Sequence, residues 1–136
     1  MKFVIDTNRL MAAILKDSST RKIIYSKNLN FITPEDAGRE LIHFNPYISK
    51  KTGLEISEVK TLFSQIMSYV EIVPKTKIQP FMKEADETMK GIDLNDSVFV
   101  ASALAVKSEG IFSHDTHFEK QNKVKVWKNK DLIKFL

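Results

Sequence analysis

The sequence predicts an α/β fold in which helices cover both faces of a parallel sheet. Five short apolar runs have the composition of buried strands, and helical patterns separate each run from the next. This alternation is typical of a parallel sheet, because each helix returns the chain to the same edge. Acidic residues follow two of the runs within three positions, which would place them beyond the carboxyl ends of strands, where open α/β sheets bind ligands.

The first strand and helix are marked by a change of pattern near the N-terminus. Residues 3–5 form an apolar run, and Asp6 follows it directly. The segment 9–16 then has a dense apolar face, which predicts a helix packed on the sheet.

The second strand, residues 30–32, leads into a helix with a recognisable start. Thr33 is a suitable cap, Pro34 fits the first turn and Asp36 lies three residues beyond the cap. We therefore expect this helix to begin immediately after the cap at Thr33.

The middle of the chain predicts two more helices around a third strand. Apolar residues recur at helical spacing over 54–70, and the strand 71–73 and a helix over 79–89 follow. Residues 50–53 form the expected flexible loop between two helices.

The last part of the chain contains an almost wholly apolar helix and two strands. We expect Asp93 to cap this helix and Gly110 to end it. The strands 111–112 and 124–127 complete the predicted sheet.

Composition excludes several classes of protein. With 136 residues, 43% hydrophobic and 28% charged, the chain is expected to form one domain, residues 1–136. No apolar run approaches the roughly 20 residues that span a bilayer. Asp6 follows only three apolar residues, which does not fit the apolar segment of a signal peptide. We therefore expect a cytoplasmic protein without membrane contact. Because the chain has no cysteine, a metal must be held by oxygen or imidazole.

The net charge of +4 comes partly from lysines crowded near the C-terminus. A solvated surface would explain each cluster, but lysines around acidic pockets also suit a nuclease, since they attract phosphate. The C-terminal lysines are Lys120, Lys123, Lys125, Lys128 and Lys130.

Four acidic residues lie where unpaired charge is costly, at the ends or edges of core segments. Asp6 and Asp115 follow strands, and each could be a cap or turn residue or a ligand. Glu40 interrupts an apolar stripe, either at its border or directed into a charged pocket. Asp96 is expected inside the apolar helix on its packed face, with the capping role left to Asp93.

Together the four carboxylates predict a metal centre. Clustered carboxylates repel one another unless a cation is present, and hard oxygen ligands suit Mg²⁺ or Mn²⁺. Such an ion lowers the pKa of a bound water and neutralises charge on a phosphodiester under attack.

The chain resembles the PIN-domain nucleases along essentially its whole length. The matching segments are 3–8, which ends in Asp6-Thr7-Asn8, the pair Glu40-Leu41, the stretch 96–103 that begins with Asp96, and 113–118, which reads Ser-His-Asp-Thr-His-Phe.

The resemblance implies a three-layer α/β/α fold with a five-stranded parallel sheet in the order 3-2-1-4-5. It also implies a Mg²⁺- or Mn²⁺-dependent endoribonuclease that cleaves single-stranded RNA. By position, the catalytic and metal-binding acids would be Asp6, Glu40, Asp96 and Asp115, supported by Thr7, Asn8 and Ser113. The length fits the VapC-like toxins of toxin–antitoxin pairs, but it does not separate them from RNA-processing members of the family. The resemblance implies a homodimer, and for a toxin it implies an antitoxin partner.

One departure from the family pattern affects the second acid that many relatives carry after the position of Asp115. Here Thr116 and His117 follow, so His117 or Glu119 would have to substitute. His114 and His117 are candidates for phosphate contacts, and Arg9 could contact substrate or form a salt bridge.

Two other functions remain open from the sequence. A catalytically idle PIN-like module would bind RNA or protein without cleaving it. A small metal-dependent phosphatase or phosphotransfer enzyme would need a second acid near Asp6, where Asn8 stands instead.

Overall fold

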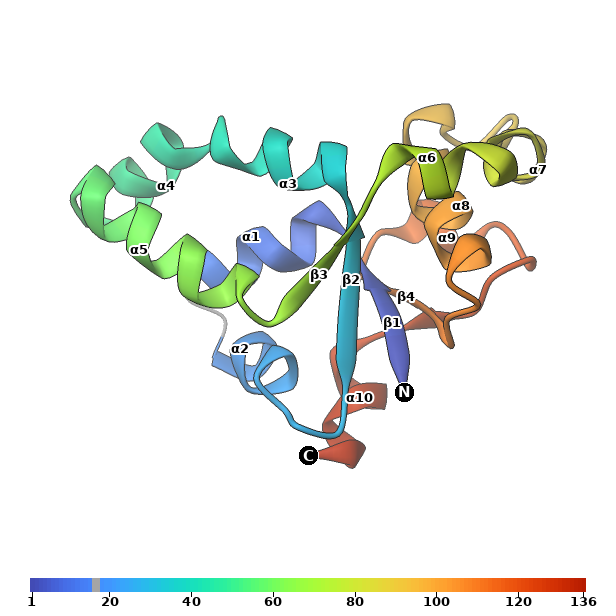
Figure 1. Cartoon of the computed structure of the whole chain (residues 1–136). Coiled ribbons are helices and arrows are strands. Elements are labelled where there is room, and N and C mark those ends of the chain that lie inside the picture. Colours follow the sequence, from blue (N-terminus) through green and yellow to red (C-terminus); the bar gives the residue numbers. More distant parts are fainter. Residues whose placement is uncertain (16–17) are drawn as a thin grey trace.

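The computed structural model describes residues 1–15 and 18–136, and within them it contains the five predicted strands. All pair in parallel, in the order β3-β2-β1-β4-β5, which confirms the expected topology (Figure 1). The strands are β1 (Lys2–Ile5), β2 (Asn30–Pro34), β3 (Val70–Val73), β4 (Gly110–Phe112) and β5 (Val126–Trp127).

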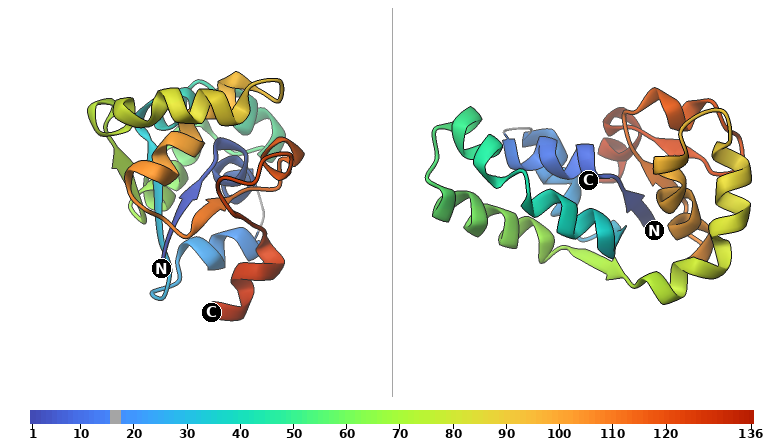
Figure 2. Two further views of the ribbon diagram at one scale, coloured as in Figure 1. Left: turned by 90° about the vertical axis from the view of Figure 1, so that its right-hand side faces the viewer. Right: turned by 90° about the horizontal axis from the view of Figure 1, so that it is seen from above.

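Helices cover both faces of the sheet, as the alternating pattern predicts. The helices of the first half of the chain gather on one side and α7 and α8 on the other (Figures 1 and 2). In the described residues the helices are α1 (Thr7–Leu15), α2 (Ser18–Ile24), α3 (Glu35–Ile42), α4 (Asn45–Thr52), α5 (Ile56–Met67), α6 (Lys75–Ile78), α7 (Met82–Met89), α8 (Ser97–Ala105), α9 (Thr116–Glu119) and α10 (Asn129–Leu132).

Alternation of side chains along the central strand divides the core in two. Phe3 and Ile5 belong to the core shared with α1, α2, α4 and α5, and Val4 belongs to the core shared with α6, α7 and α8. All three side chains are fully buried. Because β1 is covered on both faces, its carboxyl end is fixed in position, and Asp6 follows directly.

The start of α3 differs from the prediction. Thr33 does not cap the helix: its hydroxyl is buried in β2 and donates a hydrogen bond of 3.0 Å to the Ile5 carbonyl. Pro34 still pairs with Val73 of β3, so the strand continues two residues further than expected and α3 begins at Glu35. The cross-strand bond outcompetes local capping because it satisfies a buried carbonyl.

The predicted long helix and flexible loop are also revised. The helix expected over 54–70 is α5, and Val70 already belongs to β3. Most of the expected loop lies in α4, which Gly53 ends with a left-handed φ of 76°. The expected last residue of the first helix, Lys16, lies outside the described residues.

Gly110 opens β4 instead of ending the apolar helix, which already stops at Ala105. Its φ is 148°, and a Cβ there would lie 2.2 Å from the Lys125 carbonyl oxygen and 2.8 Å from Trp127 Nε1. Only glycine lets the chain around β5 approach β4 this closely. On its other side β4 pairs with β1, with Phe112 opposite Ile5, so the loop after β4 lies beside the carboxyl end of β1.

Candidate metal centre at the carboxyl edge of the sheet

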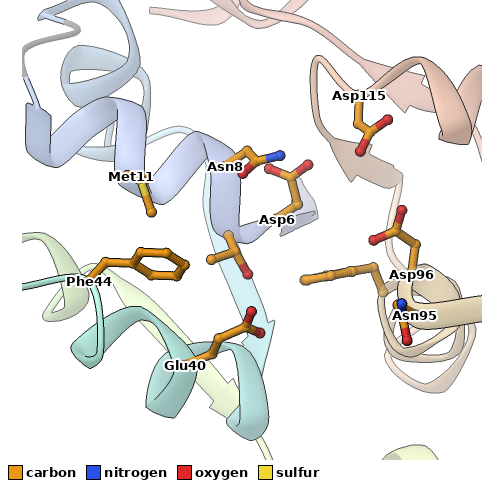
Figure 3. Close-up of a pocket in the computed structure, with 10 residues that line it drawn as sticks. Asp6, Asn8, Met11, Glu40, Phe44, Asn95, Asp96 and Asp115 are labelled. Carbon is orange, nitrogen blue, oxygen red and sulfur yellow. The ribbon is translucent and has the colours of Figure 1, made fainter. Parts of the chain in front are cut away.

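A pocket of about 200 Å³ opens where the carboxyl ends of the central strands meet α3 and α8. Four segments distant in the chain each contribute one acidic side chain to it, and Figure 3 shows their carboxylates directed toward a shared space. The lining residues are Asp6, Thr7, Asn8, Met11, Glu40, Phe44, Asn95, Asp96, Phe99 and Asp115.

Asp6 is held rigidly at the start of α1. Its Oδ1 accepts a hydrogen bond of 2.9 Å from the Arg9 backbone amide, and its Oδ2 accepts one from the Ser113 hydroxyl. Asp6 therefore caps α1, while both of its oxygens face the site. Thr7 and Asn8 both line the pocket. Ser113 contributes through its hydrogen bond to the Asp6 carboxylate.

Burial dominates the electrostatics of Asp6, of which only 4% is exposed. Burial raises the pKa of this carboxyl from 3.8 to about 6, although the hydrogen bonds from Ser113 and the Arg9 amide and the Arg9 charge oppose the shift. The nearby Asp115 carboxylate raises the pKa further. A cation bound in the pocket would remove this penalty by favouring the ionised form.

Asp115 is fixed by its own loop and the helix that follows. Its backbone amide donates to the Ser113 hydroxyl at 2.9 Å, and its Oδ1 accepts from the His117 amide at 2.9 Å, which caps α9. Ser113 thus contacts both Asp6 and Asp115, and it fixes the spacing of the two acids across the β1–β4 pair.

The prediction that Asp96 lies inside the apolar helix is wrong. Asp96 occupies the position immediately before α8. It ends a short 3₁₀ turn, Leu94–Asp96, and Asp93 caps that turn by accepting a hydrogen bond from the Asn95 amide at 2.9 Å. Partial burial and the carboxylates of Asp93 and Asp115 raise the pKa of Asp96, and contact with His117 lowers it.

Glu40 lies on the exposed border of the α3 stripe, whose Ala37 and Leu41 are buried. Its side chain also lines the acidic pocket, so the structure combines the two alternatives (Figure 3). Glu40 is the least buried of the four acids, and it can move toward a ligand at little cost.

Arg9 lines no part of the acidic pocket. Its guanidinium donates to Thr20 Oγ1 at 3.4 Å and to Asn129 Oδ1 at 3.3 Å. The backbone amide of Asn129 donates to His114 Nε2 at 3.2 Å. These contacts tie the C-terminal segment to the loop after β4, so Arg9 and His114 brace the edge of the site.

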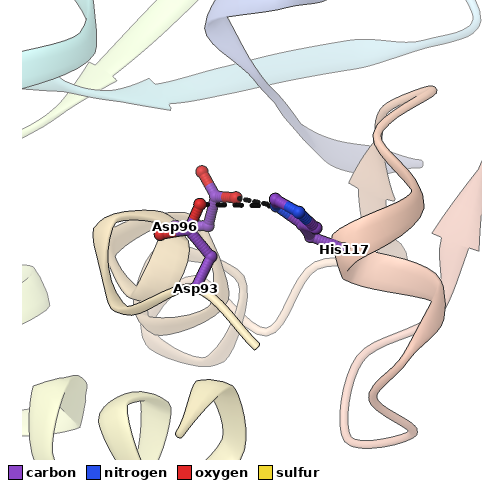
Figure 4. Close-up of side chains that lie close together, drawn as sticks. All are labelled: Asp93, Asp96 and His117. Carbon is purple, nitrogen blue, oxygen red and sulfur yellow. Dashed lines mark ion pairs between the residues drawn. The ribbon is translucent and has the colours of Figure 1, made fainter. Parts of the chain in front are cut away.

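A second group of potential ligands lies beside the pocket. Within the described residues, Asp93, Asp96 and His117 each offer one ligand atom, all within 4.8 Å of one another, so they could hold a metal (Figure 4). Glu119 is not part of this group, because it pairs with Lys128 at 2.6 Å. Of the two candidates for the missing acid, only His117 lies with the carboxylates.

Sequence patterns did not single out several lining residues. Asn95 adjoins Asp96 but has no periodic signal of its own, and Met11, Phe44 and Phe99 belong to apolar stripes. Met11 lies in the middle of α1, Phe44 between α3 and α4, and Phe99 in the first turn of α8. Only the fold shows that these positions meet at the pocket.

A parallel sheet in this strand order, with carboxylates gathered beyond β1 and β4, defines an α/β/α domain of the PIN-like class. The chain belongs to the PIN domain family, whose family model matches residues 4–133.

Among solved structures, the fold is similar to a chain in the crystal structure of VapBC2 from Rickettsia felis, bound to a DNA fragment from their promoter. The TM-score is 0.74 at 18% identity, over 94% of this chain and 98% of that chain. A search of curated proteins finds no match. Within the described part of the chain, no helix is both long and apolar enough to cross a membrane.

Proposed function

We propose that this protein is an endoribonuclease that uses Mg²⁺ or Mn²⁺ to cleave single-stranded RNA. One observation supports the proposal above all others: four carboxylates from distant segments line one pocket at the carboxyl edge of the sheet. The family supports it too, because the PIN domains that this chain resembles are typically nucleases.

The donor set fits a hard divalent cation. Asp6, Glu40, Asp96 and Asp115 offer only carboxylate oxygens, the ligands that Mg²⁺ and Mn²⁺ prefer. Without a cation, burial first and the neighbouring carboxylates second raise the pKa of Asp6 and of Asp96, so both groups resist ionisation. When bound, the ion would lower the pKa of a water and neutralise charge on the scissile phosphate.

The protein residues divide the remaining work. Asp6 and Asp115 are fixed by Ser113, so they would hold the ion in a constant place. Asp96 completes this set from the start of α8. Glu40 is exposed at the rim, where it can help to hold the ion or orient the attacking water, and no side chain is needed as a nucleophile.

The surroundings of the pocket suit a single strand. Phe44 is half-buried in the pocket wall and offers an aromatic face on which an unpaired base could stack (Figure 3). The excess of basic residues, +4 in net charge, favours a polyanionic substrate. Thr7 and Asn8 are the neutral polar groups available to phosphate oxygens.

The proposal is tested by incubating purified protein with mixed cellular RNA in Mg²⁺, in Mn²⁺ and in chelator. Cleavage should require the metal, and Asp6→Asn or Asp96→Asn should abolish it, while Asp86→Asn, an exposed change on α7, should leave it intact. If either pocket variant cut RNA at the wild-type rate, the assignment would fail. Mn²⁺ binding without any cleavage would instead indicate an idle PIN-like module.

We further propose that residues 1–136 act as one domain and form a homodimeric toxin with an antitoxin partner. The structural similarity to a chain of VapBC2 supports this proposal. Exposed apolar side chains on or next to α3, α4, α5 and β3 are available for a dimer interface: Ile42, Tyr47, Ile56, Tyr69 and Ile72. A monomer by light scattering at high concentration would contradict the dimer, and a neighbouring gene for a small DNA-binding protein would support the antitoxin.

A further inference from the structure

His117 places a ring nitrogen among the carboxylates of the site, at a position where many relatives of the resembled family carry another acid. Its Nδ1 lies 3.3 Å from Asp93 Oδ2 and 3.5 Å from Asp96 Oδ2 (Figure 4). The same atom lies 3.5 Å from Asp115 Oδ1. This atom is buried and, within the described residues, makes no hydrogen bond of good geometry, although it lies at ion-pair distance from the three carboxylates. A buried nitrogen facing carboxylates without such a bond requires an explanation.

The spacing favours a shared cation over a direct hydrogen bond. A charged N–H···O bond is usually about 2.7–2.9 Å long, shorter than the separations here. Ligand atoms bonded at about 2.1 Å lie roughly 3.0 Å apart along an octahedral edge and roughly 3.4 Å apart along a tetrahedral one. The distances of 3.3 and 3.5 Å from Nδ1 to Asp93 and Asp96 therefore fit two ligands of one ion.

Each member of the group is held in place by its backbone surroundings. Asp93 uses Oδ1 to cap the 3₁₀ turn, which leaves its Oδ2 facing His117. The His117 backbone amide is bound to Asp115, which orients the first turn of α9. Two loops that are distant in the chain thus present the ligand atoms without needing the ion to assemble them.

We infer that Asp93, Asp96 and His117 form a second cation position beside the pocket, one that selects a divalent transition metal such as Mn²⁺ over Mg²⁺. Asp96 lines the pocket and belongs to this group, so it links the two positions. The selectivity follows from the imidazole nitrogen, which transition metals accept far more readily than Mg²⁺ does. The inference concerns binding, and it stands or falls independently of RNA cleavage.

The test is electron spin-echo spectroscopy of Mn²⁺ bound to protein labelled with ¹⁵N at histidine. The wild type should show coupling between Mn²⁺ and a histidine nitrogen. His117→Gln should lose this coupling and weaken Mn²⁺ binding at this position at least ~10-fold, since even groups behind direct ligands affect affinity by that factor. Mg²⁺ affinity should change less than about twofold. His43→Gln, an exposed change beside α3, is the matched control and should keep the coupling.

Two results would overturn the inference: no histidine coupling in wild-type protein loaded with Mn²⁺, or coupling that persists in His117→Gln. Asp6→Asn separates this inference from the proposed function, because the variant should lose RNA cleavage but keep the histidine coupling. If Asp6→Asn also lost the coupling, His117 would belong to the pocket site alone and the second position would not exist.

Discussion

Replacing Asp6 by asparagine should stabilise the metal-free fold at alkaline pH. The folded protein holds the Asp6 proton more tightly than the unfolded chain does, because burial raises the pKa from 3.8 to about 6. The native state thus binds more protons between these values, so stability falls as pH rises from about 4 to about 6. The shift of roughly two pKa units corresponds to about 3 kcal/mol at pH 8.

Asparagine removes that ionisation penalty but disturbs one hydrogen bond. Ser113 donates to Asp6 Oδ2, and an amide nitrogen placed there cannot accept the bond, a loss of about 1 kcal/mol at any pH. Asp6→Asn should therefore be about 2 kcal/mol more stable than wild type at pH 8 and about 1 kcal/mol less stable at pH 4. The change between the two pH values, about 3 kcal/mol, depends only on the carboxyl.

Urea denaturation followed by circular dichroism, at both pH values and in chelator, measures this change. Asp86→Asn, on the exposed face of α7, controls for the loss of one carboxyl from the chain and should show no comparable change. An Asp6→Asn effect of equal size at pH 4 and pH 8 would refute the reasoning, because it would mean that burial does not hinder ionisation of Asp6.

Three other predictions concern metal and fold. Mn²⁺ at about 100 times its Kd should stabilise the wild type by about 2.7 kcal/mol at pH 8 in thermal unfolding, and chelator should reverse the gain; an equal gain in Asp6→Asn would count against the site. Gly110→Ala should lower the free energy of unfolding by more than about 3 kcal/mol in urea denaturation, because its Cβ would meet the Lys125 carbonyl. In the control Gly53→Ala the new Cβ meets nothing within 4 Å, so the loss should be about 1 kcal/mol. Thr33→Val should lower the free energy of unfolding by about 1–2 kcal/mol, because the buried Ile5 carbonyl would lose its hydrogen-bond partner. Thr61→Val, at an exposed position of α5, should lower it far less. Equal losses in the two variants would contradict this account.

The sheet could be predicted from sequence because each strand is a short apolar run between helical patterns. Strands buried on both faces of a parallel sheet are mostly apolar, so runs such as 3–5 and 111–112 mark them plainly. The strand order came from the family resemblance, since nothing in a single strand says which neighbour it pairs with.

The failures have a common physical cause, which is competition between local and tertiary bonds. Thr33 is a good cap by its local sequence, but its hydroxyl reaches the Ile5 carbonyl across the sheet. Asp96 lies on the helical stripe by periodicity, yet a 3₁₀ turn capped by Asp93 precedes α8. Periodicity cannot distinguish the last residue of such a turn from the first turn of a helix.

The candidate site was predictable where its residues follow strands, and not where it depends on helix packing. Asp6 and Asp115 stand at strand ends, where parallel topology brings them together. The position of Glu40 at the pocket rim and the contacts of His117 with Asp93 and Asp96 depend on how α3, α8 and α9 pack. No local pattern encodes that packing.

A calorimetric titration of metal-free protein with Mn²⁺ tests most directly whether these acids form a cation site. Wild-type protein should bind Mn²⁺ with measurable heat, and Asp6→Asn should weaken the component that belongs to the four-carboxylate pocket at least ~10-fold while Asp86→Asn does not. Wild-type heats that persist unchanged in Asp6→Asn, in a sample shown to be folded, would mean that the four carboxylates share a pocket without sharing an ion.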